Sequence, residues 1–86
     1  MNQDPPVFLR RKQVEAITGT PCSSIYARMH DGLFPTAINI GTRSVAWIAS
    51  EIYQLNAARI SGQSDDQIRQ LVLKLKANRN FKKEQA

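Results

Sequence analysis

Apolar residues in the first third of the chain recur at helical spacing. Residues 11–18 carry apolar side chains three positions apart, which predicts a short amphipathic helix ended by Gly19. A second helix is predicted directly afterwards, with Thr20 as its N-cap and Pro21 at its first position, where the missing N–H of proline costs nothing. Two short helices joined by a tight turn that contains glycine are typical of a helix-turn-helix.

The predicted second helix has one apolar side. Cys22, Ile25 and Met29 form it at spacings of three and four residues. Gly32 is predicted to end this helix, because glycine readily adopts the left-handed conformation of a C-terminal cap. Pro35 then prevents the helix from resuming. The next segment is therefore expected to be extended.

Alternation of apolar and other residues predicts a β-hairpin in that segment. With residues 41–44 as the loop, Ile40 would face Val45 and Ile38 would face Trp47. Both pairs would then lie on the same side, as a half-buried hairpin requires. We expect this hairpin to form a wing beside the helix-turn-helix.

Two more helices are predicted in the C-terminal half. The first spans roughly residues 49–60 and ends at a break over residues 61–63. Ser64 and Gln67 have the spacing of a capping box, so the second helix is predicted to start there and to run to about Asn80. The main apolar face of this last helix is formed by Ile68, Leu71, Val72 and Leu75.

The last predicted helix also carries a second apolar row on nearly the opposite side. This row consists of Leu73, Ala77 and Phe81. A domain this small cannot easily bury both sides of one helix, so we expect the row to be a dimer or partner surface. The alternative is scattered exposure in a mobile tail.

The composition is that of one small folded domain with a basic character. The chain has 86 residues, of which 42% are hydrophobic, and 12 Lys and Arg against 7 Asp and Glu give a net charge of +5. Such an excess favours an anionic partner, which could be DNA, RNA or a lipid surface. We expect residues 1–7 to form a disordered tail, residues 8–62 the DNA-binding domain, and residues 63–86 the C-terminal helix and a frayed end.

Composition argues against several other classes of protein. One Cys and one His cannot supply a structural zinc site, which needs about four ligands. Apolar runs stay well below the roughly 18–20 residues that span a bilayer, and the first residues lack the features of a signal peptide. His30 has no companions for a catalytic triad. We therefore expect no catalytic residue, no cofactor, no metal and no membrane partner, and a cytoplasmic, nucleoid-associated location.

Three segments carry the side chains expected to contact DNA. The outward side of the second helix offers groups that can reach phosphates or base edges. A basic run over residues 10–12 opens the first helix, and Arg43 at the hairpin tip could reach a phosphate or a narrow minor groove. The expected DNA-binding residues are Arg11, Lys12, Thr20, Ser23, Ser24, Tyr26, Ala27, Arg28, His30 and Arg43. The alternative is an ordinary solvated surface.

Over roughly residues 8–60, the chain resembles the AlpA-like prophage regulators, which are related to MerR-type winged helices and phage excisionases. The matching residues are Val14, Thr18-Gly19, Ser23-Ser24-Ile25-Tyr26, Gly32-Leu33-Phe34-Pro35, Ile38-Asn39-Ile40-Gly41, Arg43-Ser44-Val45-Ala46-Trp47 and Ser50-Glu51-Ile52. The Gly-x-Phe-Pro segment followed by Gly-x-Arg-Ser-Val-x-Trp is the most specific part. The resemblance implies DNA binding that controls prophage or mobile-element genes, or that directs integrase towards excision.

The predicted fold class is mainly α with a small β-hairpin: a winged helix-turn-helix of the MerR/excisionase type plus an extra C-terminal helix. The predicted function is sequence-specific binding of double-stranded DNA by a transcriptional regulator, not catalysis. A recombination directionality factor that bends DNA for integrase is one alternative. A small protein-interaction module that uses the C-terminal helix is another. A homodimer through that helix, and integrase, are the protein partners considered.

Overall fold

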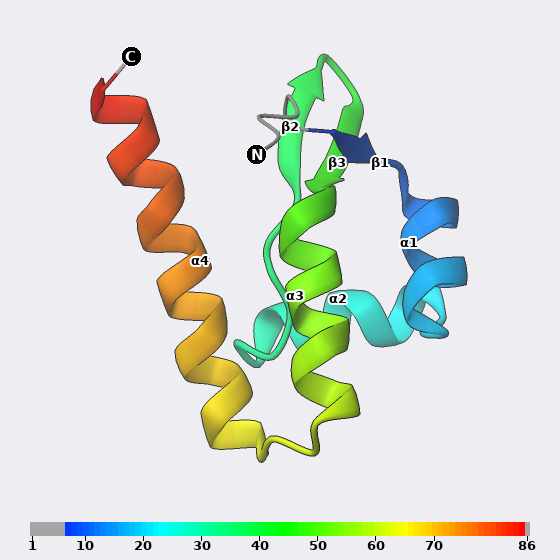
Figure 1. Cartoon of the computed structure of the whole chain (residues 1–86). Coiled ribbons are helices and arrows are strands. Elements are labelled where there is room, and N and C mark those ends of the chain that lie inside the picture. The colour runs from blue at the N-terminus through cyan, green and yellow to red at the C-terminus, as the bar shows by residue number, and fades with distance from the viewer. Residues whose placement is uncertain (1–6, 86) are drawn as a thin grey trace.

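The computed structural model describes residues 7–85, and within them the side chains of residues 7–79. Over this part of the chain, four helices accompany a small antiparallel sheet of three strands (Figure 1). In chain order the elements are β1 (Phe8–Leu9), α1 (Arg11–Thr18), α2 (Cys22–His30), β2 (Ile38–Gly41), β3 (Ser44–Ile48), α3 (Ala49–Ile60) and α4 (Asp65–Gln85). This arrangement confirms the predicted class, a winged helix-turn-helix with an additional C-terminal helix.

The turn between α1 and α2 has the expected left-handed glycine but a different cap. Gly19 ends α1 with φ of 65°. The prediction that Thr20 caps α2 and that Pro21 is its first residue is wrong, because Pro21 is itself the N-cap, with ψ of 159°. The first helical hydrogen bond runs from the Ile25 N–H to the Pro21 carbonyl at 3.0 Å, which fixes the start of α2 at Cys22.

The sheet contains one strand that the hydrophobic pattern did not reveal. β1 pairs antiparallel with β3, so that Leu9 lies opposite Trp47, and β3 is the central strand. A strand of two residues is too short to show any alternation. The carbonyl of Val7 accepts a hydrogen bond from the Ala49 N–H at 2.8 Å. Val7 therefore belongs to the folded part rather than to the expected tail, of which residues 1–6 lie outside the described residues.

The hairpin forms where it was predicted, but its register is one residue out. The observed partners are Ile38 with Ala46, Asn39 with Val45, and Gly41 with Ser44. The predicted pairs, Ile40 with Val45 and Ile38 with Trp47, are therefore wrong, and the turn has two residues instead of four.

A β-bulge explains this slip. The pairing shifts between Asn39 and Gly41, which leaves Ile40 as an extra residue that is 40% exposed. Trp47 is covered without Ile38 as its cross-strand partner, because Leu9 of β1 lies opposite Trp47 on the other edge of β3. The Trp47 indole N–H also donates to the Pro35 carbonyl at 3.1 Å, and the ring is fully buried.

Helices α3 and α4 lie side by side, with α4 returning along α3 (Figure 1). The predicted capping box is confirmed, with the Ser64 N–H donating to Gln67 Oε1 at 2.8 Å and the Gln67 N–H to Ser64 Oγ at 3.2 Å. The predicted apolar face of α4 packs inward, since Ile68, Val72 and Leu75 are buried and Leu71 is half-buried. The helix extends to Gln85 rather than ending near Asn80.

An ion pair fastens the far part of α4 to the rest of the domain. Glu51 of α3 is buried, and both of its carboxylate oxygens accept hydrogen bonds from the Arg79 guanidinium. The same guanidinium donates to the Thr36 hydroxyl at 3.2 Å and to the Thr36 carbonyl at 2.9 Å. Arg79 thus ties together α4, α3 and the segment that leads into β2.

Candidate nucleic-acid interface

The polar side of α2 faces away from the core. Ile25 is fully buried on the inner side, whereas Ser23, Ala27 and His30 are exposed and Ser24 is half-buried. The first turn of α2 contains no acidic residue, so its free N–H groups favour an approaching anion. A helix of about 10–12 Å diameter fits the major groove, which is about 12 Å wide.

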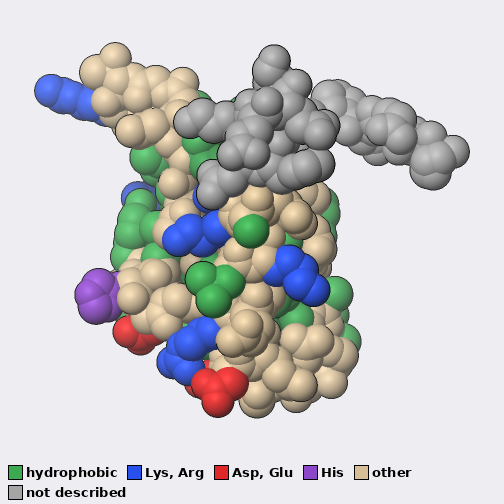
Figure 2. Space-filling view, turned by 90° about the vertical axis from the view of Figure 1, so that its left-hand side faces the viewer, with side chains coloured by type: hydrophobic (Ala, Val, Ile, Leu, Met, Phe, Trp, Pro, Cys, Tyr) green, Lys and Arg blue, Asp and Glu red, His purple; other side chains and the backbone are tan. Residues whose placement is uncertain are grey.

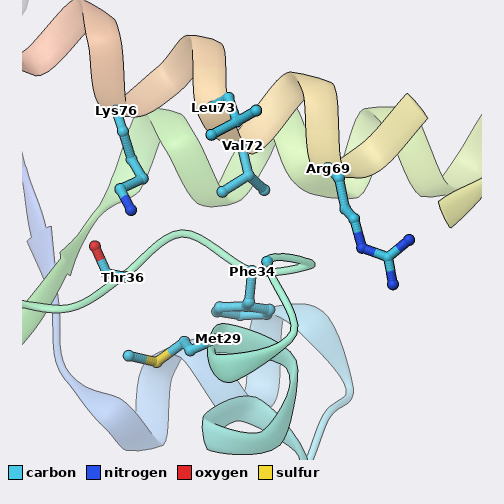
Figure 3. Close-up of a pocket in the computed structure, with 8 residues that line it drawn as sticks. Met29, Phe34, Thr36, Arg69, Val72, Leu73 and Lys76 are labelled. Atoms are coloured by element: carbon cyan, nitrogen blue, oxygen red, sulfur yellow. The ribbon is translucent and has the colours of Figure 1, made fainter. Parts of the chain in front are cut away.

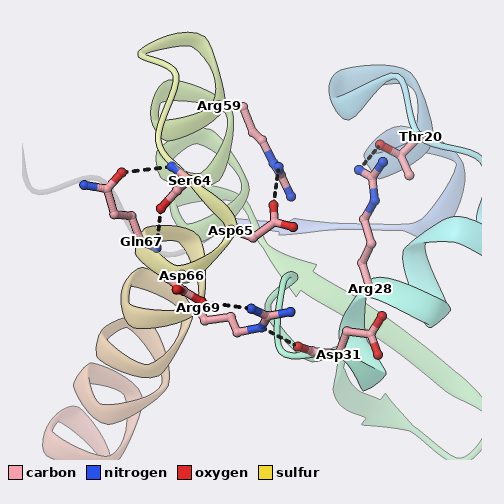
Figure 4. A network of polar contacts seen from close by, with 9 residues as sticks. All are labelled: Thr20, Arg28, Asp31, Arg59, Ser64, Asp65, Asp66, Gln67 and Arg69. Carbon is pink, nitrogen blue, oxygen red and sulfur yellow. Dashed lines mark hydrogen bonds and ion pairs between the residues drawn. The ribbon is translucent and has the colours of Figure 1, made fainter.

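Tyr26 and Arg28 lie at the borders of this outward side. Tyr26 is 44% exposed and packs edge-on against Trp47, with ring centroids 6.3 Å apart and an interplanar angle of 64°. This contact holds α2 against the central strand of the sheet. Arg28 is half-buried, and its Nη1 donates to Thr20 Oγ1 at 3.3 Å (Figure 4).

Thr20 does not lie on the outward side, contrary to the sequence prediction. Its side chain is 5% exposed, and its hydroxyl donates to the Thr18 carbonyl at 3.2 Å. After the left-handed Gly19, the Thr20 N–H donates to the Glu15 carbonyl at 3.3 Å, which holds Thr20 against the end of α1. Thr20 can therefore orient Arg28, but it presents almost no surface to a partner.

A groove brings together the basic run at the start of α1 and the tip of the hairpin. It has a volume of about 490 Å³ and is lined by Arg10, Arg11, Lys12, Tyr26, Arg43 and Val45. We call these six residues the basic groove. Tyr26 belongs to α2, so the groove reaches the helix whose outward side carries Ser23 and Ser24.

The topology of the sheet explains why these segments meet. Arg10 follows β1 directly, and β1 pairs with β3, so the start of α1 lies beside the sheet. Arg43 lies in the turn that joins β2 to β3 of the same sheet. The sequence indicated Arg11, Lys12, Tyr26 and Arg43 separately. Their convergence could not be seen without β1, and Arg10 was left out of the predicted set.

The electrostatics of the basic groove favour an anion. Its described lining contains no acidic side chain. Arg11 pairs with Glu15 at 3.1 Å, but the two side chains are 49% and 31% exposed. Such a pair contributes no more than about 1 kcal/mol, so a phosphate can compete for Arg11. The first turn of α1 also lacks an acid, and its cations lie at the positive end of the helix dipole. A bound phosphate would relieve this repulsion.

The described residues form neither a metal cluster nor a membrane-spanning helix. Among them, no group of His, Cys, Asp and Glu side chains is placed to hold a metal ion. Within the same part of the chain, every helix is too short or too polar to cross a membrane. Leu73 is 60% exposed on α4 and Ala77 is exposed beside it, whereas the side chain of Phe81 lies outside the described residues.

Comparison with known proteins identifies the family. Residues 7–60 match the family model described as prophage CP4-57 regulatory protein (AlpA). The chain belongs to the AlpA family of prophage regulatory proteins. The AlpA match covers the helix-turn-helix, the sheet and α3, and hence every residue of the basic groove. Helix α4 lies beyond the AlpA match.

A curated relative comes from a phage. The chain is 38% identical over 56 residues to a protein named uncharacterized protein ORF88 of Enterobacteria phage P4. The aligned part covers 65% of this chain and 64% of the phage protein, so the chain spans just under two thirds of the length of this relative. No solved structure matches the chain significantly.

Proposed function

We propose that the protein binds double-stranded DNA, with α2 in the major groove and the basic groove on the sugar–phosphate backbone. The observation that carries this proposal is the convergence of four cations from two distant segments, Arg10, Arg11, Lys12 and Arg43, beside the outward side of α2. Membership of a family of prophage regulatory proteins supports it. Binding to DNA would place the protein in the cytoplasm, at the nucleoid.

The proposed contacts have two different roles. The hydroxyls of Ser23 and Ser24 lie on the side of α2 that would face base edges and phosphates, and Arg28 borders it. His30 and Ala27 are the exposed residues further along the same helix. The cations of the basic groove would hold the backbone, which fixes the position of the helix without reading sequence.

The salt dependence of binding follows from the number of phosphates neutralised. Four groove cations give a slope of log K against log salt of about −3 to −4. Arg43→Ala should weaken binding to every duplex and reduce the magnitude of the slope by about one. Lys74→Ala is the matched control, because Lys74 is an exposed cation on α4, which lies on the opposite side of α3 from α1 (Figure 1). Equal effects of the two substitutions would refute the assignment.

The regulatory role is the finer part of the proposal. We infer that the binding controls prophage or mobile-element genes, because the family is one of prophage regulators. Selection of bound duplexes from a random pool would give the operator, and the footprint length would report whether one copy or two bind. An excision assay with the cognate integrase would separate a gene regulator from a recombination directionality factor.

A further inference from the structure

A second hollow lies on the α4 side of the molecule, away from the basic groove. It has a volume of about 160 Å³ and lies between α4 and the segment that follows α2 (Figure 3). Met29, Phe34 and Val72 provide apolar surface, and Leu73, which is 60% exposed, stands at the edge. A cavity of about 150 Å³ accommodates a benzene ring, so this hollow suits one bulky apolar side chain.

Two cations frame this hollow. Arg69 and Lys76 both line it from α4, and Figure 3 shows them on either side of Val72 and Leu73. Seven positions separate the two cations, which is about 10 Å along a helix. Arg69 also bonds the Asp31 carbonyl at 3.1 Å and Asp66 at 3.2 Å, which holds its guanidinium in place (Figure 4). We call Met29, Phe34, Arg69, Val72, Leu73 and Lys76 the α4 pocket.

The charge of α4 argues against a second copy of the same helix as the occupant. The acids of α4 stand at its two ends, as Asp65, Asp66 and Glu84, and residues 67–83 between them contain no Asp or Glu but six Lys and Arg, of which Arg79 is paired with Glu51: Arg69, Lys74, Lys76, Arg79, Lys82 and Lys83. Pairing two such helices would bring like charges together, which is destabilising. Figure 2 looks at the side on which α4 lies and shows hydrophobic side chains standing among Lys and Arg side chains. An acidic occupant would complement this surface.

We propose that the α4 pocket binds an acidic amphipathic helix of another protein. One bulky apolar side chain of the partner fills the hollow. Carboxylates two helical turns apart pair with Arg69 and Lys76, so the partner carries acids at positions i and i+7 with an apolar residue between them. The α4 pocket shares no lining residue with the basic groove, although Met29, which lines the pocket, belongs to α2. The inference does not depend on DNA binding.

Selection from a displayed library of helical peptides with randomised surface positions tests this proposal. The full chain is one target, and Arg69→Glu/Lys76→Glu is the other. The full chain should enrich peptides with two acids flanking an apolar residue, and the charge-reversed variant should enrich basic ones. For an enriched peptide, Leu73→Ala should lower affinity about tenfold or more, whereas Lys74→Ala should change it little. Leu73 is mostly exposed, so its truncation leaves the fold intact.

Several results would overturn the proposal. They are the absence of enrichment on either target, enrichment without acids, peptide affinity that is unaffected by Leu73→Ala, and self-association of the full chain that Leu73→Ala abolishes. A loss of duplex affinity in Lys76→Glu as large as that in a basic-groove variant would show a nucleic-acid surface instead. Failure of the chain to bind any duplex would refute the proposed function and leave this inference standing.

Discussion

Removal of Arg79 should weaken the attachment of α4 to the domain formed by residues 7–60, which match the AlpA family. Its Nε donates to Glu51 Oε2 at 2.7 Å, and its other two nitrogens bind the second Glu51 oxygen and Thr36. The side chain of Glu51 is 6% exposed and that of Arg79 is 20% exposed. In Arg79→Leu, the Glu51 carboxylate loses its counter-charge at a position that water hardly reaches.

The magnitude follows from this burial. Breaking a buried ion pair by removing one partner costs about 3–5 kcal/mol. Because Arg79 keeps some exposure, we expect the lower limit, about 3 kcal/mol. For a domain of this size, each kcal/mol lowers Tm by about 4–8 °C, so Arg79→Leu should melt about 12–24 °C lower. Glu51→Leu should cost less, since Arg79, the more exposed partner, can turn towards solvent.

Urea and thermal unfolding of the two single variants and of the double variant measure this coupling. Glu51→Leu/Arg79→Leu should recover part of the loss and lie about 1–2 kcal/mol below the original chain, because apolar side chains replace a buried pair at little cost whereas the Thr36 carbonyl and hydroxyl still lack their donor. Lys74→Ala is the control and should change stability by less than about 0.5 kcal/mol. Additive losses in the double variant, or a loss in Arg79→Leu no larger than in the control, would refute the reasoning.

Three further substitutions test other features. Thr20→Val should weaken duplex binding only while Arg28 is present, because it removes the hydroxyl that orients the Arg28 guanidinium. A double-mutant cycle of duplex affinity with Arg28→Ala measures this, and Thr20→Ser should restore binding. An equal effect of Thr20→Val in the Arg28→Ala background would contradict the assignment. Gly19→Ala should lower the free energy of unfolding by about 1 kcal/mol, measured in urea, because φ is 65° although the site has room for a Cβ. Trp47→Phe should cost about 1–3 kcal/mol in the same assay by leaving the buried Pro35 carbonyl without its donor, and no loss would contradict the role given to the indole.

Local patterns in the sequence predicted the helices well. The bounds of α1 and α3 agree with the predicted segments, and the capping box at Ser64 was found from spacing alone. These features depend on side chains within one or two helical turns, which the sequence displays directly. The wing was also predicted, because apolar and other residues alternate along its two strands.

Features that depend on distant segments were missed or placed wrongly. The bulge at Ile40 shifts the hairpin register, and the residues of the turn gave no sign of a bulge. The pair between Glu51 and Arg79 joins positions 28 residues apart, which local spacing cannot reveal. The basic groove depends on β1, a strand of two residues. Sequence therefore indicated four of the six residues that line the basic groove but not their convergence, and it placed Thr20 on the wrong side.

Mapping the contact face by NMR tests the central claim most directly. A selected duplex is titrated into the isotope-labelled chain, and backbone amide shifts are followed. We predict the largest changes at residues 10–12, 23–28 and 42–43, which form the basic groove, the outward side of α2 and the hairpin turn, with little change over residues 68–79 of α4. Changes concentrated on α4, or none with any duplex, would contradict the account.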